Sequence, residues 1–197
     1  MILYFDTETT GLSPGNICQL SYIMEDNDKH TSKNFFFEVD YVNPFAQKVH
    51  GFSTERLKVL SGGRRFYGYR EEIYEDFKSA NLIVAHNLSF DLNFLIKEFE
   101  ENNMQFLYKQ GLCSMRHFTP VCKILRANGR GYKYPKLSEL AEYFGLYPYD
   151  TTINTAKMFN CNVDAHDARY DTTMLYLSIK NALIKDDRFK EFISKYI

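Results

Sequence analysis

The chain has 197 residues, of which 45% are hydrophobic, and its formal net charge is −1. That length suits one domain with an ordinary hydrophobic core. The near-neutral charge excludes a global field that would attract a polyanion, so any contact with nucleic acid must come from a local patch. The four cysteines are far apart and predict neither a zinc knuckle nor a disulfide framework. No signal peptide or membrane span is recognisable, and we expect a cytoplasmic protein without membrane contact.

Two carboxylates follow an apolar run at the start of the chain. Residues 2–5 are typical of a buried strand, and Asp6 and Glu8 come directly after it. Because side chains alternate between the two faces of a strand, both acids should project from the same face at its carboxyl end. Ligands bind there in open α/β sheets, and hard oxygen ligands suit magnesium or manganese. The alternative is a polar turn that caps the strand.

Strands and helices then alternate along the chain, which predicts an α/β fold. Strands are expected at 17–24 and 34–39, separated by the polar run 25–33, and again at 82–85. Helices are expected at 53–60, 69–79, 89–102, 115–125, 138–144, 167–184 and 186–197. No repeat or linker interrupts the series. We therefore expect a single domain, with a core over about 1–184 and a helical tail over 185–197.

A further acid lies on the apolar stripe of the helix expected at 89–102. Asp91 precedes Phe94 and Leu95 by three and four residues, so the three side chains share one helix face. An unpaired carboxylate is costly to bury, so Asp91 needs a metal ion, a basic partner or a water-filled cleft. The alternative is a solvent-facing position at the margin of the stripe.

The segment 123–136 carries five cations, two tyrosines and no acid. Cations that contact phosphates and rings that stack on bases are what a groove for single-stranded nucleic acid uses. We predict that this segment, including Arg130 and Lys133, contacts a nucleic-acid strand upstream of the reacting nucleotide. The alternative is a solvated loop.

A histidine and an acid come together around the start of the last long helix. Asp171 lies on its apolar stripe, and His166 precedes Asp171 by five residues, which on one continuous helix would place them about 140° apart. They can converge only if His166 lies at or before the helix start. The helix dipole would there disfavour the protonated imidazole and keep it available as a base. The alternative is that His166 packs against its neighbours or faces solvent without a chemical role.

Four carboxylates exceed what one metal ion needs once its retained waters are counted, and two ions fit better. Two ions about 3.5–4 Å apart clamp the attacking and leaving oxygens of an in-line displacement at phosphorus. In that reading, His166 accepts the proton of the attacking water.

Three stretches resemble the motifs of the DEDD exonucleases: Phe-Asp-Thr-Glu-Thr-Thr-Gly-Leu at 5–12, His-Asn-Leu-Ser-Phe-Asp at 86–91 and His-Asp-Ala-Arg-Tyr-Asp at 166–171. The resemblance is to the histidine subclass, which includes the proofreading subunit of bacterial DNA polymerase III, ribonuclease T and oligoribonuclease. It implies a ribonuclease H-like fold with a mixed five-stranded sheet flanked by helices. It also implies 3′-to-5′ removal of nucleotides with two magnesium or manganese ions.

The resemblance further implies a role for each matching residue. Asp6 would bridge the ions, Glu8 and Asp171 would bind the water-activating ion, Asp91 would contact the water shell of the second ion, and His166 would be the general base. Leu12 would act as a wedge between bases. The residues implied around the terminal nucleotide are Thr9, Thr10, Leu12, His50 and Phe90.

We therefore expect a metal-dependent 3′–5′ exonuclease that releases nucleoside monophosphates from single-stranded or frayed DNA ends. A DNA polymerase or the replication machinery is the partner to consider. Two alternatives stay open: an exoribonuclease or oligoribonuclease with the same site, and a polymerase-associated module with weak catalysis.

Overall fold

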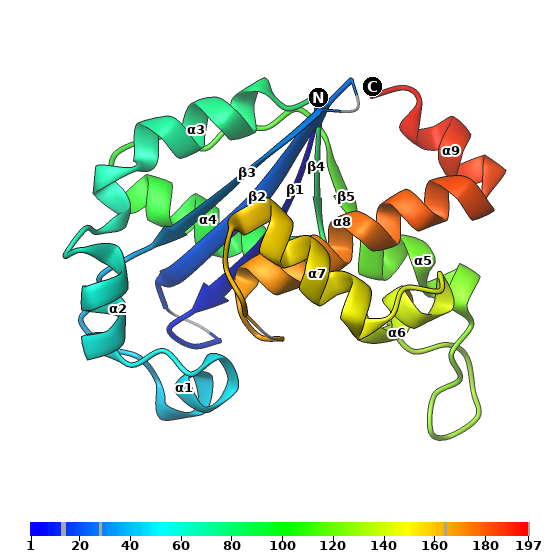
Figure 1. The fold of residues 1–197 in the computed structure, drawn as a ribbon, viewed down its shortest axis with the longest axis horizontal. Helices are drawn as coiled ribbons and strands as arrows, with labels where there is room; N and C mark the ends of the chain where they lie inside the picture. Colours follow the sequence, from blue (N-terminus) through cyan, green and yellow to red (C-terminus); the bar gives the residue numbers. More distant parts are fainter. Residues whose placement is uncertain (13–14, 28, 164, 197) are drawn as a thin grey trace.

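A five-stranded sheet runs through the centre of the computed structural model, which describes residues 1–12, 15–27, 29–163 and 165–196 (Figure 1). The strands are β1 (Ile2–Thr9), β2 (Ile17–Asp26), β3 (Lys29–Phe36), β4 (Leu82–Ala85) and β5 (Gly111–Cys113), in the spatial order β3-β2-β1-β4-β5. The pairs β1–β2 and β2–β3 are antiparallel, whereas β1–β4 and β4–β5 are parallel. The predicted mixed sheet is confirmed.

Helices cover both faces of this sheet (Figure 1). α3 (Arg70–Ser79) and α4 (Leu88–Glu101) pack on one face, and α8 (Ala168–Lys185) packs on β1 and β2 from the other. The remaining helices are α1 (Pro44–His50), α2 (Thr54–Ser61), the short 3-10 helix Phe66–Gly68, α5 (Ser114–Cys122), α6 (Leu137–Tyr143), α7 (Pro148–Phe159) and α9 (Asp187–Ile193). Within the ranges described above, none of these helices has both the length and the apolar character needed to cross a membrane.

Alternation along β1 decides which way the site residues point. Leu3 and Phe5 enter the hydrophobic core beneath α3 and α4, whereas Ile2 and Tyr4 enter the core that includes α8. Successive side chains of a strand point to opposite faces. Asp6 and Glu8 therefore continue the series of Ile2 and Tyr4 toward α8, and Thr7 points toward α4.

The second β-hairpin differs from the prediction. β3 spans Lys29–Phe36 rather than 34–39, and most of the polar run 25–33 belongs to the paired strands, with Glu25 opposite His30. β3 lies at the sheet edge, and its first residues are exposed. Because these side chains face water, the strand lacks the apolar alternation that would reveal it.

Four of the described elements were not predicted: α1, the 3-10 helix Phe66–Gly68, β5 and α7. Asn43 caps α1 by accepting a hydrogen bond from the Phe45 backbone, and Pro44 occupies the first helical position. Proline suits that position, so Asn43-Pro44 begins a helix here rather than only breaking a pattern. Pro148 begins α7 in the same way.

The C-terminal helical tail packs on the main domain. α9 buries Phe189 and Ile193 in the core that contains α8. The predicted tail extends to residue 197, which lies outside the described residues.

Candidate active site

Three acids from two elements meet at the carboxyl end of β1. Oxygens from the carboxylates of Asp6, Glu8 and Asp171 all lie within 4.8 Å of one another. Asp6 and Glu8 come from β1, and Asp171 comes from the first turn of α8. This confirms that the two strand acids share a face and that Asp171 points inward. An all-oxygen set of donors suits a hard divalent cation.

Burial and mutual repulsion raise the pKa of each acid in this cluster. The pKa of Asp6 is well above its usual value because of burial and of the charges on Asp91 and Asp171. Burial, followed by the charge of Asp171, raises the pKa of Glu8 to about 9. Burial raises the pKa of Asp171 to about 6, against the opposing effect of His166. Without a cation, Glu8 thus retains a proton near neutral pH, and a divalent cation would displace it.

Asp91 stands beside this cluster and has its own partner. Its side chain on α4 is 4% exposed, and its Oδ1 accepts a hydrogen bond of 2.7 Å from the Thr7 hydroxyl. Burial raises its pKa to about 7, although the Thr7 hydrogen bond lowers it. The predicted place of Asp91 on the apolar stripe is confirmed. Sequence analysis assigned no role to Thr7. Its position between Asp6 and Glu8 places its side chain on the opposite face of β1, toward α4.

His166 precedes α8, as the separation of five residues required. Its backbone N–H donates to Asp171 Oδ2 at 3.2 Å, and its φ is 64°. The side chain is exposed, and its charge acts on the pKa values of both Asp171 and His50. The imidazole is therefore near enough to Asp171 and His50 to influence both electrostatically.

A buried polar network fixes the start of α8 to β2. Gln19 donates through Nε2 to Asp167 Oδ1 at 2.9 Å and accepts at Oε1 from the Ala168 backbone at 3.0 Å. Arg169 makes two side-chain hydrogen bonds to Asp167, of 2.8 and 2.7 Å. Gln19 pairs with Glu8 across β1 and β2. The network therefore holds the α8 acid against the strand acids. Sequence analysis missed it, although Asp167 before a helix is a recognisable cap.

A cavity of about 520 Å³ lies next to the acids. Four of the residues predicted around the terminal nucleotide line it, namely Thr9, Leu12, His50 and Phe90. Phe45 and Val49 of α1 also line it and were missed because α1 was missed. Leu12 is 85% exposed and Phe45 is 82% exposed, so two apolar side chains stand free at this cavity. A flat aromatic ring in the cavity could pack against these two side chains.

The polar atoms of three predicted residues shape the chain around the cavity. The Thr9 hydroxyl donates to a backbone carbonyl two residues on, and the Thr10 hydroxyl accepts from the Asn16 backbone. Thr10 does not line this cavity. His50 Nδ1 accepts from the Phe52 backbone at 3.0 Å, so Nε2 carries the proton and donates to the Thr9 carbonyl at 3.2 Å. The His50 ring thus contributes a face to the cavity and ties α1 to β1.

The loop after β1 is held by the far end of α4. Glu98 is 4% exposed, and its Oε1 accepts from the Ile17 backbone at 2.9 Å and from the Asn16 side chain at 3.1 Å. The Lys97 amine donates to the Gly15 carbonyl at 2.7 Å. The loop that carries Leu12 is therefore anchored, and sequence analysis had assigned no role to Glu98.

Arg130 and Lys133 lie elsewhere, on a hairpin between α5 and α6, and neither lines the cavity beside the acids.

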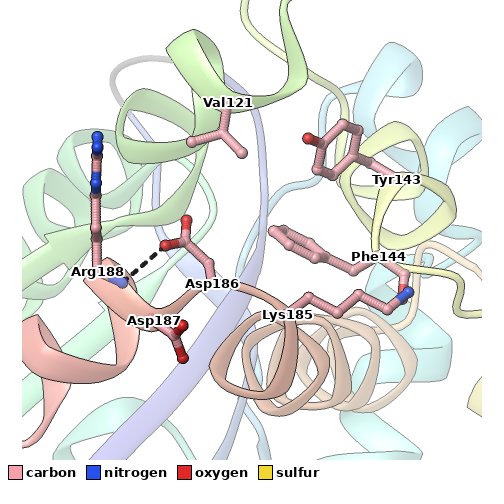
Figure 2. A pocket seen from close by; sticks show the side chains of 7 residues that line it. All are labelled: Val121, Tyr143, Phe144, Lys185, Asp186, Asp187 and Arg188. Atoms are coloured by element: carbon pink, nitrogen blue, oxygen red, sulfur yellow. Dashed lines mark hydrogen bonds between the residues drawn. The ribbon is translucent and has the colours of Figure 1, made fainter.

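A second cavity, of about 540 Å³, lies between α5, α6 and the junction of α8 with α9 (Figure 2). Its lining includes Lys185, which donates to the Phe144 carbonyl. None of the predicted site residues lines this second cavity. We therefore place the functional site at the acid cluster.

Comparison with known proteins gives a family match over most of the chain. The model of the RNase T exonuclease family matches residues 3–178. The chain is 30% identical over 175 residues to the PolC-type DNA polymerase III of Mycoplasmopsis pulmonis, an alignment that covers 87% of this chain and 11% of that protein. It is 31% identical over 148 residues to the 3′-5′ exonuclease DinG of Staphylococcus aureus, covering 72% of this chain and 15% of that protein. The chain thus spans a small part of the curated relatives that it matches.

The fold recurs in a solved nuclease. Exonuclease I of Escherichia coli, in complex with a dA16 oligonucleotide, matches with a TM-score of 0.76 and 16% identity, over 98% of this chain and 43% of that chain. The fold and the acidic site define a nuclease with a ribonuclease H-like architecture. More specifically, the chain belongs to the RNase T exonuclease family, as its three motifs predicted.

Proposed function

We propose that this chain removes nucleoside monophosphates from the 3′ ends of single-stranded or frayed DNA by hydrolysis. The observation that carries the proposal is the cluster of Asp6, Glu8 and Asp171, with carboxylate oxygens within 4.8 Å, next to His166. Membership of the exonuclease family supports the reaction. DNA is favoured because the relatives include PolC-type DNA polymerases and the fold is shared with an exonuclease that was solved with a deoxyoligonucleotide.

We assign the chemistry to five side chains. Asp6, Glu8, Asp91 and Asp171 would hold two magnesium or manganese ions, which, when bound, supply positive charge and acidify a water molecule. The imidazole of His166 takes the proton from the attacking water and is exposed enough to pass it to solvent. Asp91 Oδ1 accepts the hydrogen bond from Thr7, and the other carboxylate oxygen, Oδ2, is the one that would bind an ion.

The cavity beside Glu8 receives the terminal nucleotide in this proposal. Leu12 and Phe45 are the exposed apolar side chains available to a base, and Thr9, His50 and Phe90 line the cavity with them. Thr10 contributes by shaping the loop that carries Leu12.

Wider assignments form part of the same proposal. Residues 1–197 act as one exonuclease domain, and proofreading or repair beside a DNA polymerase is the setting that the PolC-type relatives suggest. Four free cysteines suit a reducing compartment such as the cytoplasm.

The test is digestion of labelled single-stranded DNA, duplex DNA and RNA of one sequence, side by side with magnesium, with manganese and with chelator. We expect stepwise shortening of single-stranded DNA from the 3′ end, with none in chelator and none by Asp171→Asn. Faster turnover of RNA would instead assign an exoribonuclease. Cleavage of no substrate with either metal would refute the proposal and favour a module without catalysis.

A further inference from the structure

The segment between α5 and α6 folds as a short β-hairpin. Leu125 and Tyr132 form an antiparallel bridge, the Arg126 backbone donates to the Gly131 carbonyl at 3.1 Å, and the Lys133 backbone donates to the Ile124 carbonyl at 2.8 Å. We refer to residues 124–134 as the basic hairpin. Its backbone is preorganised, so binding by it would order few further residues.

The basic hairpin concentrates positive charge. Residues 123–136 contain five cations and no acid, although the whole chain has a net charge of −1. Lys133 is engaged, because its amine lies 2.6 Å from an oxygen of Glu139 on α6. Arg126 and Arg130 form no ion pair within the part of the chain that the structure describes. Among the cations of the hairpin itself, these two arginines, unlike Lys133, have no carboxylate partner among the described residues. Within the described structure the Arg126 side chain donates only through Nε, to the Tyr132 carbonyl at 3.1 Å, so its terminal nitrogens stay available to a partner.

Apolar and aromatic side chains of the same hairpin are also exposed. Tyr134 is 57% exposed, Tyr132 is 40% exposed and Leu125 is 60% exposed. An exposed ring next to an arginine offers one surface on which a base can stack and one charge for its phosphate. This combination of charge and exposed rings favours nucleic-acid binding over the alternative of a solvated loop.

The base of the hairpin is attached to the catalytic end of the sheet. His86, which directly follows β4, has Nε2 2.9 Å from the Pro135 carbonyl and Nδ1 3.0 Å from the Ser114 hydroxyl. The carbonyl can only accept, so Nε2 donates. His86 also begins the motif that ends at Asp91. In Figure 1 the hairpin projects at the end of the molecule toward which β1 points, with α1 on the opposite side of the strand ends.

We propose that the basic hairpin is an arm that binds single-stranded nucleic acid upstream of the scissile nucleotide, through Arg126, Arg130 and Tyr134. The terminal nucleotide lies in the cavity beside α1, and the strand behind it passes toward the hairpin. This inference rests on the proposed function for the position of the strand, but its binding surface is tested separately from cleavage.

The experiment is a titration of binding to single-stranded DNA of about 16 nucleotides in calcium, over a series of salt concentrations. Each phosphate contact on a single strand contributes about 0.7 to the slope of log affinity against log salt. We expect Arg126→Ala/Arg130→Ala to flatten that slope by about 1.4. Tyr134→Ala should weaken binding by about 5- to 100-fold and leave the slope unchanged.

A matched control removes two charges from the other end of the sheet. Lys29→Ala/Lys190→Ala changes the net charge equally, at exposed positions on β3 and α9. It should leave slope and affinity as in the unmodified protein. Equal slopes for both double variants, or losses as large for a trinucleotide as for the long strand, would overturn the proposal. Because these readouts are binding constants, a protein that binds as expected but cleaves nothing would refute the proposed function instead.

Discussion

Replacing Glu8 by glutamine should stabilise the protein in chelator at neutral pH, because burial and the neighbouring acids both disfavour the charged form of Glu8. Its pKa is raised from the usual 4.5 to about 9, mainly by burial and then by Asp171. Between these two values the folded state binds more protons than the unfolded state, so the stability that Glu8 contributes falls as the pH rises. The neutral amide of glutamine removes this dependence.

The magnitude follows from the same values. At pH 7, Glu8 is ionised in the unfolded chain and protonated in the folded protein. Taking up this proton on folding lowers the free energy of unfolding by about 3 kcal/mol, since the pH lies about 2.5 above the usual pKa. Coupling to neighbouring acids spreads this cost among them, so we expect Glu8→Gln to gain about 1–3 kcal/mol. For a domain of this size that gain corresponds to roughly 3–10 °C in Tm.

The assay is thermal unfolding from pH 4.5 to pH 8, in chelator and in magnesium. The gain should vanish near pH 4.5 and grow toward pH 8. Saturating magnesium should reverse the order, because an ion at 100 times its Kd adds about 2.7 kcal/mol to the protein that binds it. The exposed Glu142→Gln is the matched control and should change neither curve. A Glu8→Gln gain that is the same at all pH values, or absent in chelator, would refute the reasoning.

Three further positions give separate outcomes. His166→Ala should lower kcat by about 10²–10⁴ in steady-state assays, and His166→Gly, equally inactive, should be about 1 kcal/mol more stable than His166→Ala in urea unfolding, because glycine tolerates the φ of 64°. Gln19→Leu should cost about 1–3 kcal/mol in the same unfolding measurement, since Asp167 and the Ala168 N–H each lose a buried partner. Glu98→Ala should raise KM more than it lowers kcat, because it frees the loop that carries Leu12, whereas Glu98→Gln, which keeps the acceptor oxygen, should restore KM. A KM that stays unchanged in Glu98→Ala would remove its positioning role.

Local periodicity was sufficient to place the acids. A period of two residues sets Asp6 and Glu8 on one face of β1, and helical spacing turns Asp91 and Asp171 inward, so no long-range information was needed. The position of His166 before α8 followed from helix geometry alone.

The remaining features depend on contacts between distant parts of the chain. Gln19 and Asp167 are 148 residues apart in sequence, and nothing local to either residue indicates that they meet. The free charge of Lys133 was overestimated because its partner, Glu139, lies on the following helix. α1 was missed because the sequence Asn43-Pro44 marks both a turn and a helix start.

The hydrogen bonds that position the site do not use the carboxylates of Asp6 and Glu8, which are needed for binding a cation. Thr7 fixes Asp91, Gln19 fixes the start of α8, and Glu98 fixes the loop after β1. Among the described residues, no hydrogen bond is made to the carboxylates of Asp6 or Glu8 by another side chain. These oxygens are therefore held close together by groups that do not compete for them, and the cost is their raised pKa. The repulsion is already present in the folded protein, and its relief by a bound cation contributes to the affinity for that cation.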